Sequence, residues 1–196
     1  SGINYYGSQG ARAVAEATPP RHPGFLSEVC AAWEAATRPA ADAGIRTVQL
    51  RTGVVLSPAG GALRLMLPAF RLGLGGRIGE PDQYFSWIAL DDAIGGYYHA
   101  LWTEEVEGPV NLTAPHPATM EAFATTLADV LDRPAPVRVP AGVVRAALGE
   151  VADEMMLQSL RVLPEKLQET GYTFLFPDLE GALRHVLGKT TEPLDA

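Results

Sequence analysis

Apolar residues recur with helical spacing in four stretches of the chain, and short β-type runs lie between them. The helical spacing predicts helices over residues 25–43, 62–72, 91–102 and 120–131. Pro68 lies inside the second stretch and is expected to bend or break it. β-branched and aromatic runs predict strands over residues 45–56, 84–90 and 108–115, and the first of these runs into a loop at Thr52–Gly53. Helices that alternate with strands predict an α/β fold with parallel pairing.

The two ends of the chain have different patterns. Ile3, Tyr5 and Tyr6 precede a glycine and predict the end of a buried strand, and residues 8–24 are rich in proline and glycine and predict a loop. From Pro134 onward the pattern is mostly helical, with one short strand predicted over 172–176. The last helix has a predicted buried stripe of Leu179, Leu183 and Val186. Only two predicted strands are long and buried, too few for a complete doubly wound sheet.

Composition narrows the classes of function. The 196 residues are 47% hydrophobic, enough for a sizeable core. A net charge of −8 without a basic cluster disfavours a nucleic-acid partner. No apolar run approaches the roughly 20 residues that span a bilayer, so no membrane partner is predicted. The single cysteine, Cys30, excludes an intrachain disulfide and fits a reducing compartment, so a cytoplasmic location is expected.

Several catalytic and binding motifs are missing. The four histidines have no metal-ligand spacing, which disfavours a zinc site. No G-x-S-x-G supports serine-hydrolase chemistry. No G-x-G-x-x-G follows a strand and opens a helix, since the glycine-rich stretch over 73–79 follows a predicted helix. The segment that would cradle dinucleotide phosphates is therefore absent from this sequence.

Four blocks of sequence occur in a recognisable order, namely GVVLSPAGGALRLMLPAFRLGLGGRIG, QYFSWIALDDAIGGYYHAL, GPVNLTAP and LPEKLQETGYTFLFPDLEGAL. In order and spacing the chain resembles the extended short-chain dehydrogenase/reductase superfamily from residue 1 to about 188. The resemblance is to its NAD(P)-dependent nucleoside-diphosphate-sugar epimerase-like subgroup with a C-terminal helical extension. It implies the C-terminal part of an NAD(P)-binding Rossmann fold (1–60), a small α+β substrate lobe (61–133) and a mostly helical extension (134–196).

The resemblance also implies roles for particular residues. It places residues 1–7 at the fifth strand of the Rossmann sheet, whose carboxyl end carries the catalytic face. The family has a catalytic serine or threonine there, for which Ser1 is the nearest candidate. Tyr5 and Tyr6 are the further catalytic candidates, as a hypothesis for the acid/base work, with the substrate itself as the alternative. The implied cofactor-binding residues, in a loop near the nicotinamide, are Arg51, Thr52, Gly53 and Val54. The implied substrate-binding residues are Arg71, Gln83, Ser86 and Trp87.

Each of these roles has a structural alternative. Either tyrosine and Trp87 can simply pack in the core. Arg51 ends a buried strand, so its charge is expected to have a carboxylate or backbone partner. A solvated surface role is favoured for Arg71 and Gln83, and Asp92 is read mainly as a residue that starts a helix.

The chain departs from the family at two places. If Glu34 is the glutamate that follows the family's Tyr-x-x-x-Lys dyad, then Leu26 and Cys30 occupy the dyad positions. An alignment shifted by one residue places Phe25 and Val29 there instead, which supplies no dyad either. No lysine occurs before Lys166. Phe85 stands where sugar epimerases place an arginine that grips the substrate pyrophosphate. Three arginines lie upstream and are candidates to replace it: Arg64, Arg71 and Arg77.

Two functions follow as hypotheses. The first is an NAD(P)-dependent epimerase- or dehydratase-like oxidoreductase, with NADP favoured, whose main phosphate-binding segment lies outside this chain. The second is a catalytically inactive NADP(H)-binding sensor or scaffold; an interaction fragment is a weaker third. The expected partners are a small-molecule substrate and either the protein's own N-terminal half or a second copy, because the strand edge toward that half would be exposed.

Overall fold

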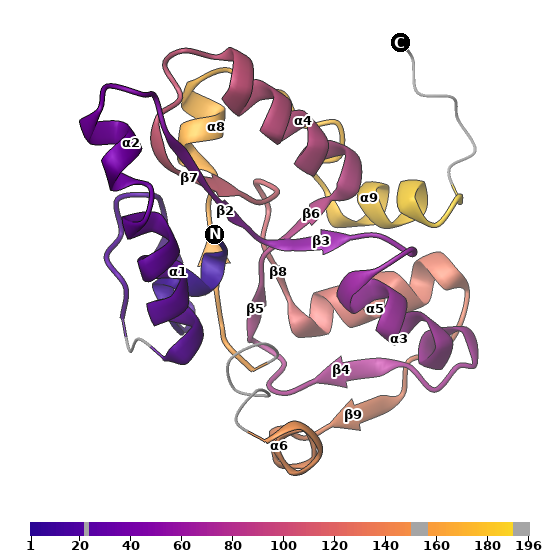
Figure 1. Ribbon diagram of the computed structural model, residues 1–196. Coiled ribbons are helices and arrows are strands. Elements are labelled where there is room, and N and C mark those ends of the chain that lie inside the picture. The colour runs from indigo at the N-terminus through magenta and orange to yellow at the C-terminus, as the bar shows by residue number, and fades with distance from the viewer. Residues whose placement is uncertain (22–23, 150–156, 190–196) are drawn as a thin grey trace.

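The computed structural model describes residues 1–21, 24–149 and 157–189. Its helices, labelled in Figure 1, are η1 (Ile3–Tyr6), α1 (Phe25–Ala35), α2 (Arg38–Asp42), α3 (Gly61–Arg71), α4 (Leu90–Trp102), α5 (Met120–Leu131), α6 (Ala141–Leu148), α8 (Glu165–Glu169) and α9 (Leu179–Val186). Its strands are β1 (Ala13–Val14), β2 (Val48–Thr52), β3 (Val54–Leu56), β4 (Gly76–Ile78), β5 (Tyr84–Phe85), β6 (Trp87–Ala89), β7 (Gly108–Leu112), β8 (Ala118–Thr119), β9 (Val137–Val139) and β10 (Arg161–Val162). Within these residues only β5 and β8 pair antiparallel and the other pairs are parallel, which confirms the α/β class.

Residues 48–56 form two strands with different partners. β2 pairs in parallel with β7, and β3 pairs in parallel with β6. The change occurs at Gly53, where a Cβ atom would lie 2.8 Å from Thr113 Cγ2 and 2.9 Å from the Ser86 carbonyl oxygen. The predicted interruption at Thr52–Gly53 is therefore confirmed, although the chain continues as the strand β3 and not as a loop. Crowding from two neighbouring segments leaves room only for glycine at this point.

The predicted strand over 84–90 is also divided. β5 ends at Phe85 and β6 begins at Trp87. Between them, Ser86 Oγ donates to the Leu160 carbonyl oxygen at 2.7 Å and accepts the Val162 N–H at 2.9 Å. The serine therefore holds the C-terminal part of the chain at the point where the two strands separate.

The opening segment is not a strand. Residues 3–6 form the 3₁₀ helix η1, in which the Tyr5 N–H donates to the Gly2 carbonyl oxygen at 3.1 Å. Gly7 follows with a φ of 61°, a conformation that favours glycine. Only Gly2 forms a bridge, in parallel to Thr52 at the end of β2. The strand prediction fails because a short apolar run does not distinguish strand from helix.

The predicted helix over 25–43 is two helices, α1 and α2. The Thr37 hydroxyl donates to the Glu34 carbonyl oxygen at 2.8 Å where α1 ends. Cys30 is buried as expected, but Phe25 and Trp33 on the same predicted apolar side are 71% and 61% exposed. The buried residues of α1 are Ser27 and Cys30, so the prediction of a buried apolar side is wrong at Phe25 and Trp33 and holds at Cys30.

Three other helices match their predictions. α3 forms as predicted, but it continues through Pro68 without the expected break. α5 begins directly after Thr119, whose side chain is of a type that caps helices and whose hydroxyl accepts the Ala122 N–H at 3.1 Å. On α9 Leu183 is fully buried, and the other two residues of the predicted stripe pack against the same core.

The C-terminal third contains different strands from the one predicted. No strand forms over 172–176, because the N–H groups of Leu175 and Phe176 donate to the Asp92 carboxylate at 2.7 and 2.9 Å. Asp92 does lie in the first turn of α4, but it is fully buried and binds this distant segment rather than its own helix. Strands form instead at β9 and β10.

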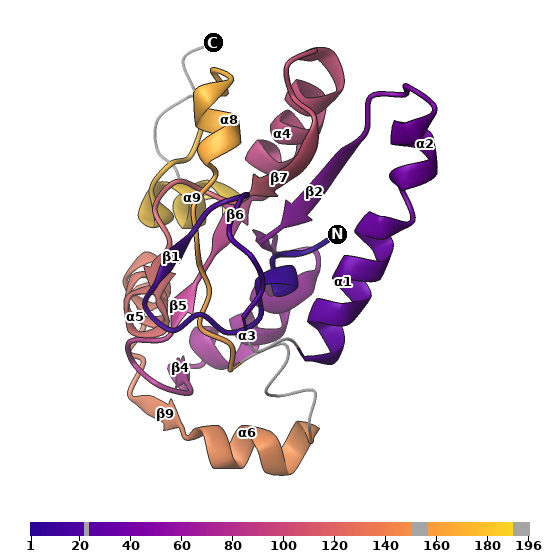
Figure 2. The ribbon, with the colours of Figure 1, turned by 90° about the vertical axis from the view of Figure 1, so that its left-hand side faces the viewer.

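The segment from 157 to 166 holds the first sixteen residues of the chain in place. β10 pairs in parallel with β1. The Gln9 N–H donates to the Ser159 carbonyl oxygen at 3.0 Å, and the Lys166 N–H donates to Glu16 Oε1 at 3.2 Å. Figure 2 shows these two distant parts of the chain side by side.

The core has two main clusters. The larger lies between α3, α5 and α9 and includes Trp87, Phe123 and Leu127. The other packs α4 and α8 against β2 and β7 and includes Leu112 and Leu167. These clusters fix the carboxyl ends of β2 and β7, where ligands bind in open α/β sheets.

Candidate functional site

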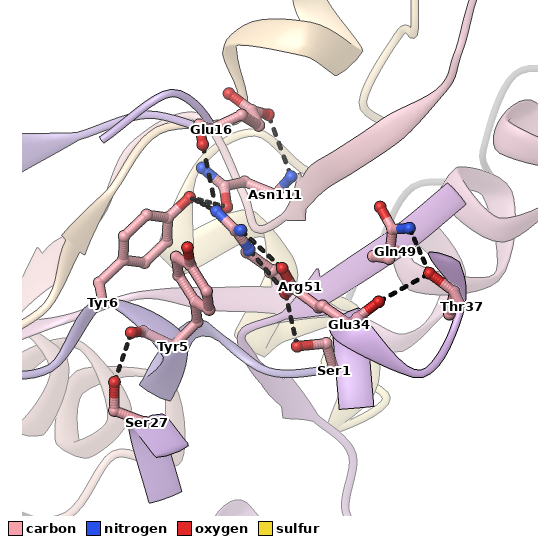
Figure 3. A network of polar contacts seen from close by, with 10 residues as sticks. All are labelled: Ser1, Tyr5, Tyr6, Glu16, Ser27, Glu34, Thr37, Gln49, Arg51 and Asn111. Carbon is pink, nitrogen blue, oxygen red and sulfur yellow. Dashed lines mark hydrogen bonds and ion pairs between the residues drawn. The ribbon is translucent and has the colours of Figure 1, made fainter. Parts of the chain in front are cut away.

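Arg51 is the centre of a buried polar network at the end of β2 (Figure 3). Its guanidinium group binds Glu34 of α1 in a bidentate ion pair, with Nε–Oε1 at 2.8 Å and Nη2–Oε2 at 2.7 Å. Nη1 donates to Tyr6 Oη at 3.0 Å and to the Glu16 carbonyl oxygen at 3.1 Å. Burial lowers the pKa of the guanidinium group, but the bonds to Glu34 and Tyr6 outweigh it and raise that pKa above its ordinary value. The prediction that Arg51 has a carboxylate or backbone partner is confirmed, since it has both.

The two tyrosines have unequal environments. Tyr6 is fully buried, and its Oη donates to Asn111 Oδ1 at 2.7 Å while it accepts the Arg51 bond. Tyr5 is half-buried, and its ring lies 3.5 Å from the Arg51 guanidinium carbon. Its Oη has no hydrogen-bond partner in the described part of the chain, and the Ser27 hydroxyl donates to the Tyr5 backbone carbonyl oxygen at 2.7 Å. Tyr5 therefore has the phenol that remains free for a ligand.

Ser1 completes the group. Its Oγ donates to Glu34 Oε1 at 2.8 Å, so the three residues predicted to be catalytic gather around one ion pair (Figure 3). Sequence reasoning missed Glu16 and Asn111, although Glu16 Oε1 accepts the Asn111 N–H at 3.0 Å inside this network. The sequence did contain a signal for Asn111, because an asparagine inside a short apolar strand is expected to be buried and its amide group then needs hydrogen-bond partners. The catalytic roles themselves stay predictions.

The residues predicted to bind the cofactor lie where β2 passes into β3. The Thr52 N–H donates to the Ser1 carbonyl oxygen at 3.4 Å, and the Val54 N–H donates to the Ser86 carbonyl oxygen at 2.9 Å. These N–H groups are therefore used within the fold. These bonds place the end of β2 beside Ser1. The contact of the four residues with a cofactor stays a prediction.

The residues predicted to bind substrate are not assembled into one surface. Both hydrogen bonds of the Ser86 hydroxyl go to the segment around Leu160, as described above. Trp87 is completely buried in the larger core cluster. Gln83 is buried, so the prediction of a solvated glutamine is wrong. Arg71 is exposed at the end of α3, in a hollow of about 410 Å³ that it shares with Arg133 and Lys189.

The remaining chemical expectations concern the missing dyad, metals and membranes. Leu26 and Cys30 both lie on α1, as do Phe25 and Val29 of the alternative alignment, and the match of either pair with the family's dyad stays a prediction. Across residues 1–21, 24–149 and 157–189, no histidine, cysteine or carboxylate cluster has the geometry of a metal site. None of the helices within those ranges is long and apolar enough to cross a bilayer.

Tyr6 and Tyr172 are expected to ionise later than an ordinary tyrosine. Burial raises the pKa of both; Arg51 opposes this at Tyr6, and Asp92 adds to it at Tyr172. The folded state thus favours the neutral phenols. The stability that they contribute is complete below about pH 10, the pKa of an unfolded tyrosine, and is lost as the pH rises further. In a titration followed by phenolate absorbance, these two of the six tyrosines should ionise last. Ionisation of all six at the ordinary pKa would contradict this.

Comparisons with known proteins place the chain among longer relatives. Residues 139–186 match a family described as "Domain of unknown function (DUF1731)". The chain is 44% identical over 193 residues to Epimerase family protein Mb2239 of Mycobacterium bovis, covering 98% of this chain and 63% of that protein. It is 40% identical over 187 residues to human Epimerase family protein SDR39U1, covering 95% of this chain and 64% of that protein.

Solved structures agree with the sequence comparisons. The structure of human SDR39U1 (isoform2) with NADPH superposes with a TM-score of 0.91 at 38% identity, covering 97% of this chain and 64% of that one. A nucleoside-diphosphate sugar epimerase from Corynebacterium glutamicum superposes with a TM-score of 0.76 at 34% identity, covering 96% of this chain and 36% of that one. The chain thus spans less than two thirds of the length of these relatives. The Rossmann-like fold that the sequence predicted is confirmed by these superpositions. The chain belongs to the extended short-chain dehydrogenase/reductase family, in its epimerase-like group.

Proposed function

We propose that this chain is the C-terminal part of an NAD(P)-dependent, epimerase- or dehydratase-like oxidoreductase that uses NADP(H). The observation that carries the proposal is the likeness to human SDR39U1 with NADPH, which covers 97% of the chain at 38% identity. A nicotinamide cofactor supplies the hydride chemistry of such an enzyme. The chain has one cysteine and therefore no intrachain disulfide, as is usual in a reducing compartment, which supports the proposal of a cytoplasmic location.

The residues around Arg51 support a site of this kind. Ser1 and Tyr5 lie at the carboxyl end of β2, the position where open α/β sheets bind their ligands. The Glu34–Arg51 pair holds the Ser1 hydroxyl and the Tyr5 ring in place. Since the Tyr6 hydroxyl is already bonded on both sides, we assign proton transfer to Tyr5 and give Tyr6 a structural role.

The substrate is proposed to be a small molecule other than a nucleoside-diphosphate sugar. Phe85 packs against Phe123, with ring centroids 4.7 Å apart, at the position of the family's phosphate-binding arginine. Arg77 forms an ion pair with Glu121 at 2.9 Å. Arg64 donates to a carbonyl oxygen of the preceding turn. Of the three candidate arginines, Arg71 is exposed in the hollow that it shares with Arg133 and Lys189, and it is the one proposed to bind an anionic group of the substrate.

The proposal is tested with the protein encoded by the complete reading frame. Tyr5→Phe should reduce hydride exchange between NADPH and a responsive carbonyl compound by about 100-fold or more, the usual contribution of a general acid or base. The affinity for NADPH should stay unchanged. Tyr6→Phe is the matched control, and it should lower stability more than turnover. Unchanged turnover in both variants would exclude the tyrosines from the chemistry.

The second candidate is an inactive NADP(H)-binding sensor or scaffold. The presence of Leu26 and Cys30 at the dyad positions favours it, because a leucine and a buried cysteine supply neither an acid nor a cation. Titration of NADPH and NADH against the same protein distinguishes the two functions. Binding of NADPH without hydride exchange across a panel of carbonyl compounds would select the sensor.

A further inference from the structure

Ser1 gives its hydroxyl proton to Glu34. Its Oγ donates to Glu34 Oε1 at 2.8 Å, and the same carboxylate group holds the bidentate ion pair with Arg51. An ionised carboxylate accepts hydrogen bonds and donates none, so the proton of the Ser1–Glu34 bond comes from the serine. Ser1 is exposed, and its side chain makes no other hydrogen bond in the described part of the chain. Toward a ligand, Ser1 Oγ therefore offers lone pairs and no proton.

The bond to Glu34 is strong enough to persist when a ligand binds. Hydrogen bonds to an ionised group are roughly twice as strong as those between neutral groups. The Glu34 side chain is only 14% exposed, which limits competition from water. If the Ser1 hydroxyl turned toward a neutral ligand, it would exchange a charge-assisted bond for a weaker one. Glu34 therefore keeps Ser1 in the role of a hydrogen-bond acceptor.

Tyr5 adds the complementary group. Its ring lies 3.5 Å from the guanidinium carbon of Arg51, so Tyr5 and Ser1 both contact the same ion pair (Figure 3). The Tyr5 phenol has no partner among the described residues and has a proton to donate. A ligand oxygen that both residues bind therefore accepts a hydrogen bond from Tyr5 and has to donate one to Ser1.

An alcohol group meets both requirements. Its oxygen accepts one hydrogen bond while its proton is donated in another. A carbonyl oxygen accepts from Tyr5 but has no proton for Ser1, and its lone pairs would face those of Ser1 Oγ. An ammonium group donates to Ser1 but cannot accept from Tyr5. The two residues therefore distinguish an alcohol from the corresponding ketone.

We propose that Glu34 is a specificity-determining residue, which acts through Ser1 to select the alcohol form of the substrate over its ketone form. Ser1 contacts the substrate hydroxyl, and Glu34 is the positioning residue that fixes the direction of this hydrogen bond. The inference rests on the proposed function and names its substrate class, a secondary alcohol. The ribose hydroxyl groups of a nicotinamide cofactor have the same hydrogen-bonding chemistry, so the experiment has to distinguish these two sources.

Equilibrium binding of two matched probes tests the proposal on the protein encoded by the complete reading frame, without cofactor. Cyclohexanol and cyclohexanone share one ring and differ in the oxygen group. Ligand-observed NMR gives the two dissociation constants, and cyclohexanol should bind about tenfold more tightly, because a site that hydrogen-bonds a hydroxyl rejects an analogue without one. Methoxycyclohexane, an ether that only accepts hydrogen bonds, should bind as weakly as cyclohexanone.

Variants assign this preference to Ser1 and Glu34. Ser1→Ala should abolish it by weakening the binding of cyclohexanol, and Ser1→Thr should retain it. The double variant Arg51→Met/Glu34→Leu should abolish it differently, by strengthening the binding of cyclohexanone, because the proton of Ser1 is released. Ser57→Ala is the matched control, since Ser57 Oγ accepts the Ala59 N–H in another turn, and it should leave the preference unchanged. If the double variant fails to fold, the two Ser1 variants still decide.

Three outcomes would overturn the inference. They are equal affinity for the two probes, no measurable binding of either, and an unchanged preference in Ser1→Ala. Displacement of cyclohexanol by NADPH would assign the contact of Ser1 to the cofactor ribose and would overturn it as well. Because hydride exchange is not measured, the proposed function fails separately: an inactive protein that prefers cyclohexanol contradicts that function alone, and an active protein without the preference contradicts this inference alone.

Discussion

The Arg51→Met variant is expected to lose about 4 kcal/mol of unfolding free energy, the usual result of removing one partner from a buried ion pair. The substitution leaves the Glu34 carboxylate without its bidentate cation and removes the donor to Tyr6 and to the Glu16 carbonyl oxygen. For a chain of this length the loss lowers the melting temperature by about 10 °C. Urea unfolding should show a lower midpoint with an unchanged slope.

Arg64→Met is the matched control for this experiment. Arg64 is exposed and makes one hydrogen bond to a nearby carbonyl oxygen, so its loss should change stability by about 0.5 kcal/mol at most. The double variant Arg51→Met/Glu34→Leu should lose less than the sum of the two single variants, because no unpaired charge remains. A loss below about 1 kcal/mol for Arg51→Met would contradict the central role of the pair.

The Asp92→Ala variant is expected to lose about 3 kcal/mol, because hydrogen bonds to a charged group are strong and their buried donors would be left unpaired. The carboxylate accepts the N–H groups of Leu175 and Phe176, and Asp92 also accepts the Tyr172 hydroxyl at its carbonyl oxygen. The segment from 172 to 176 should therefore detach from α4. Faster amide hydrogen exchange at these two N–H groups would report the detachment directly.

The neighbouring residue provides the control. Asp91 carries the same charge on the same helical turn, but it is exposed and binds His185 at 2.7 Å. Asp91→Ala should cost about 1 kcal/mol at most, as exposed ion pairs do. Equal losses for the two variants would show that the charge at the start of α4 matters and the long-range contact does not.

The sequence predicts those elements whose cause is local. The helices α3, α5 and α9 follow from apolar spacing, and the start of α5 follows from the Thr119 cap. The interruption at Thr52–Gly53 also follows from the sequence, but the different partners of β2 and β3 do not, because β7 and β6 lie far along the chain. The strand over 172–176 is wrong for the same reason, since its backbone donors bind a carboxylate some 80 residues away.

The candidate site is predictable only in part. A buried arginine at a strand end needs a partner, and that requirement is visible in the sequence. The identity of Glu34 is not, because it depends on where α1 crosses β2. The resemblance brings Ser1 and Tyr5 to the right strand end but does not distinguish Tyr5 from Tyr6. Only the contacts show that one phenol is bonded on both sides.

The pairing of β1 with β10 has a consequence for the order in which the chain folds. The contacts of Gln9 with Ser159 and of Glu16 with Lys166 join residues about 150 positions apart. Contacts of such high sequence separation form late and slow the folding rate. On a ribosome, the segment that carries Tyr5 and Tyr6 emerges about 150 residues before the segment that it contacts, so it cannot settle until residues 157–166 have followed. A polypeptide that stops short of residue 157 should therefore leave this segment unfixed, although every residue of the Arg51 network is present.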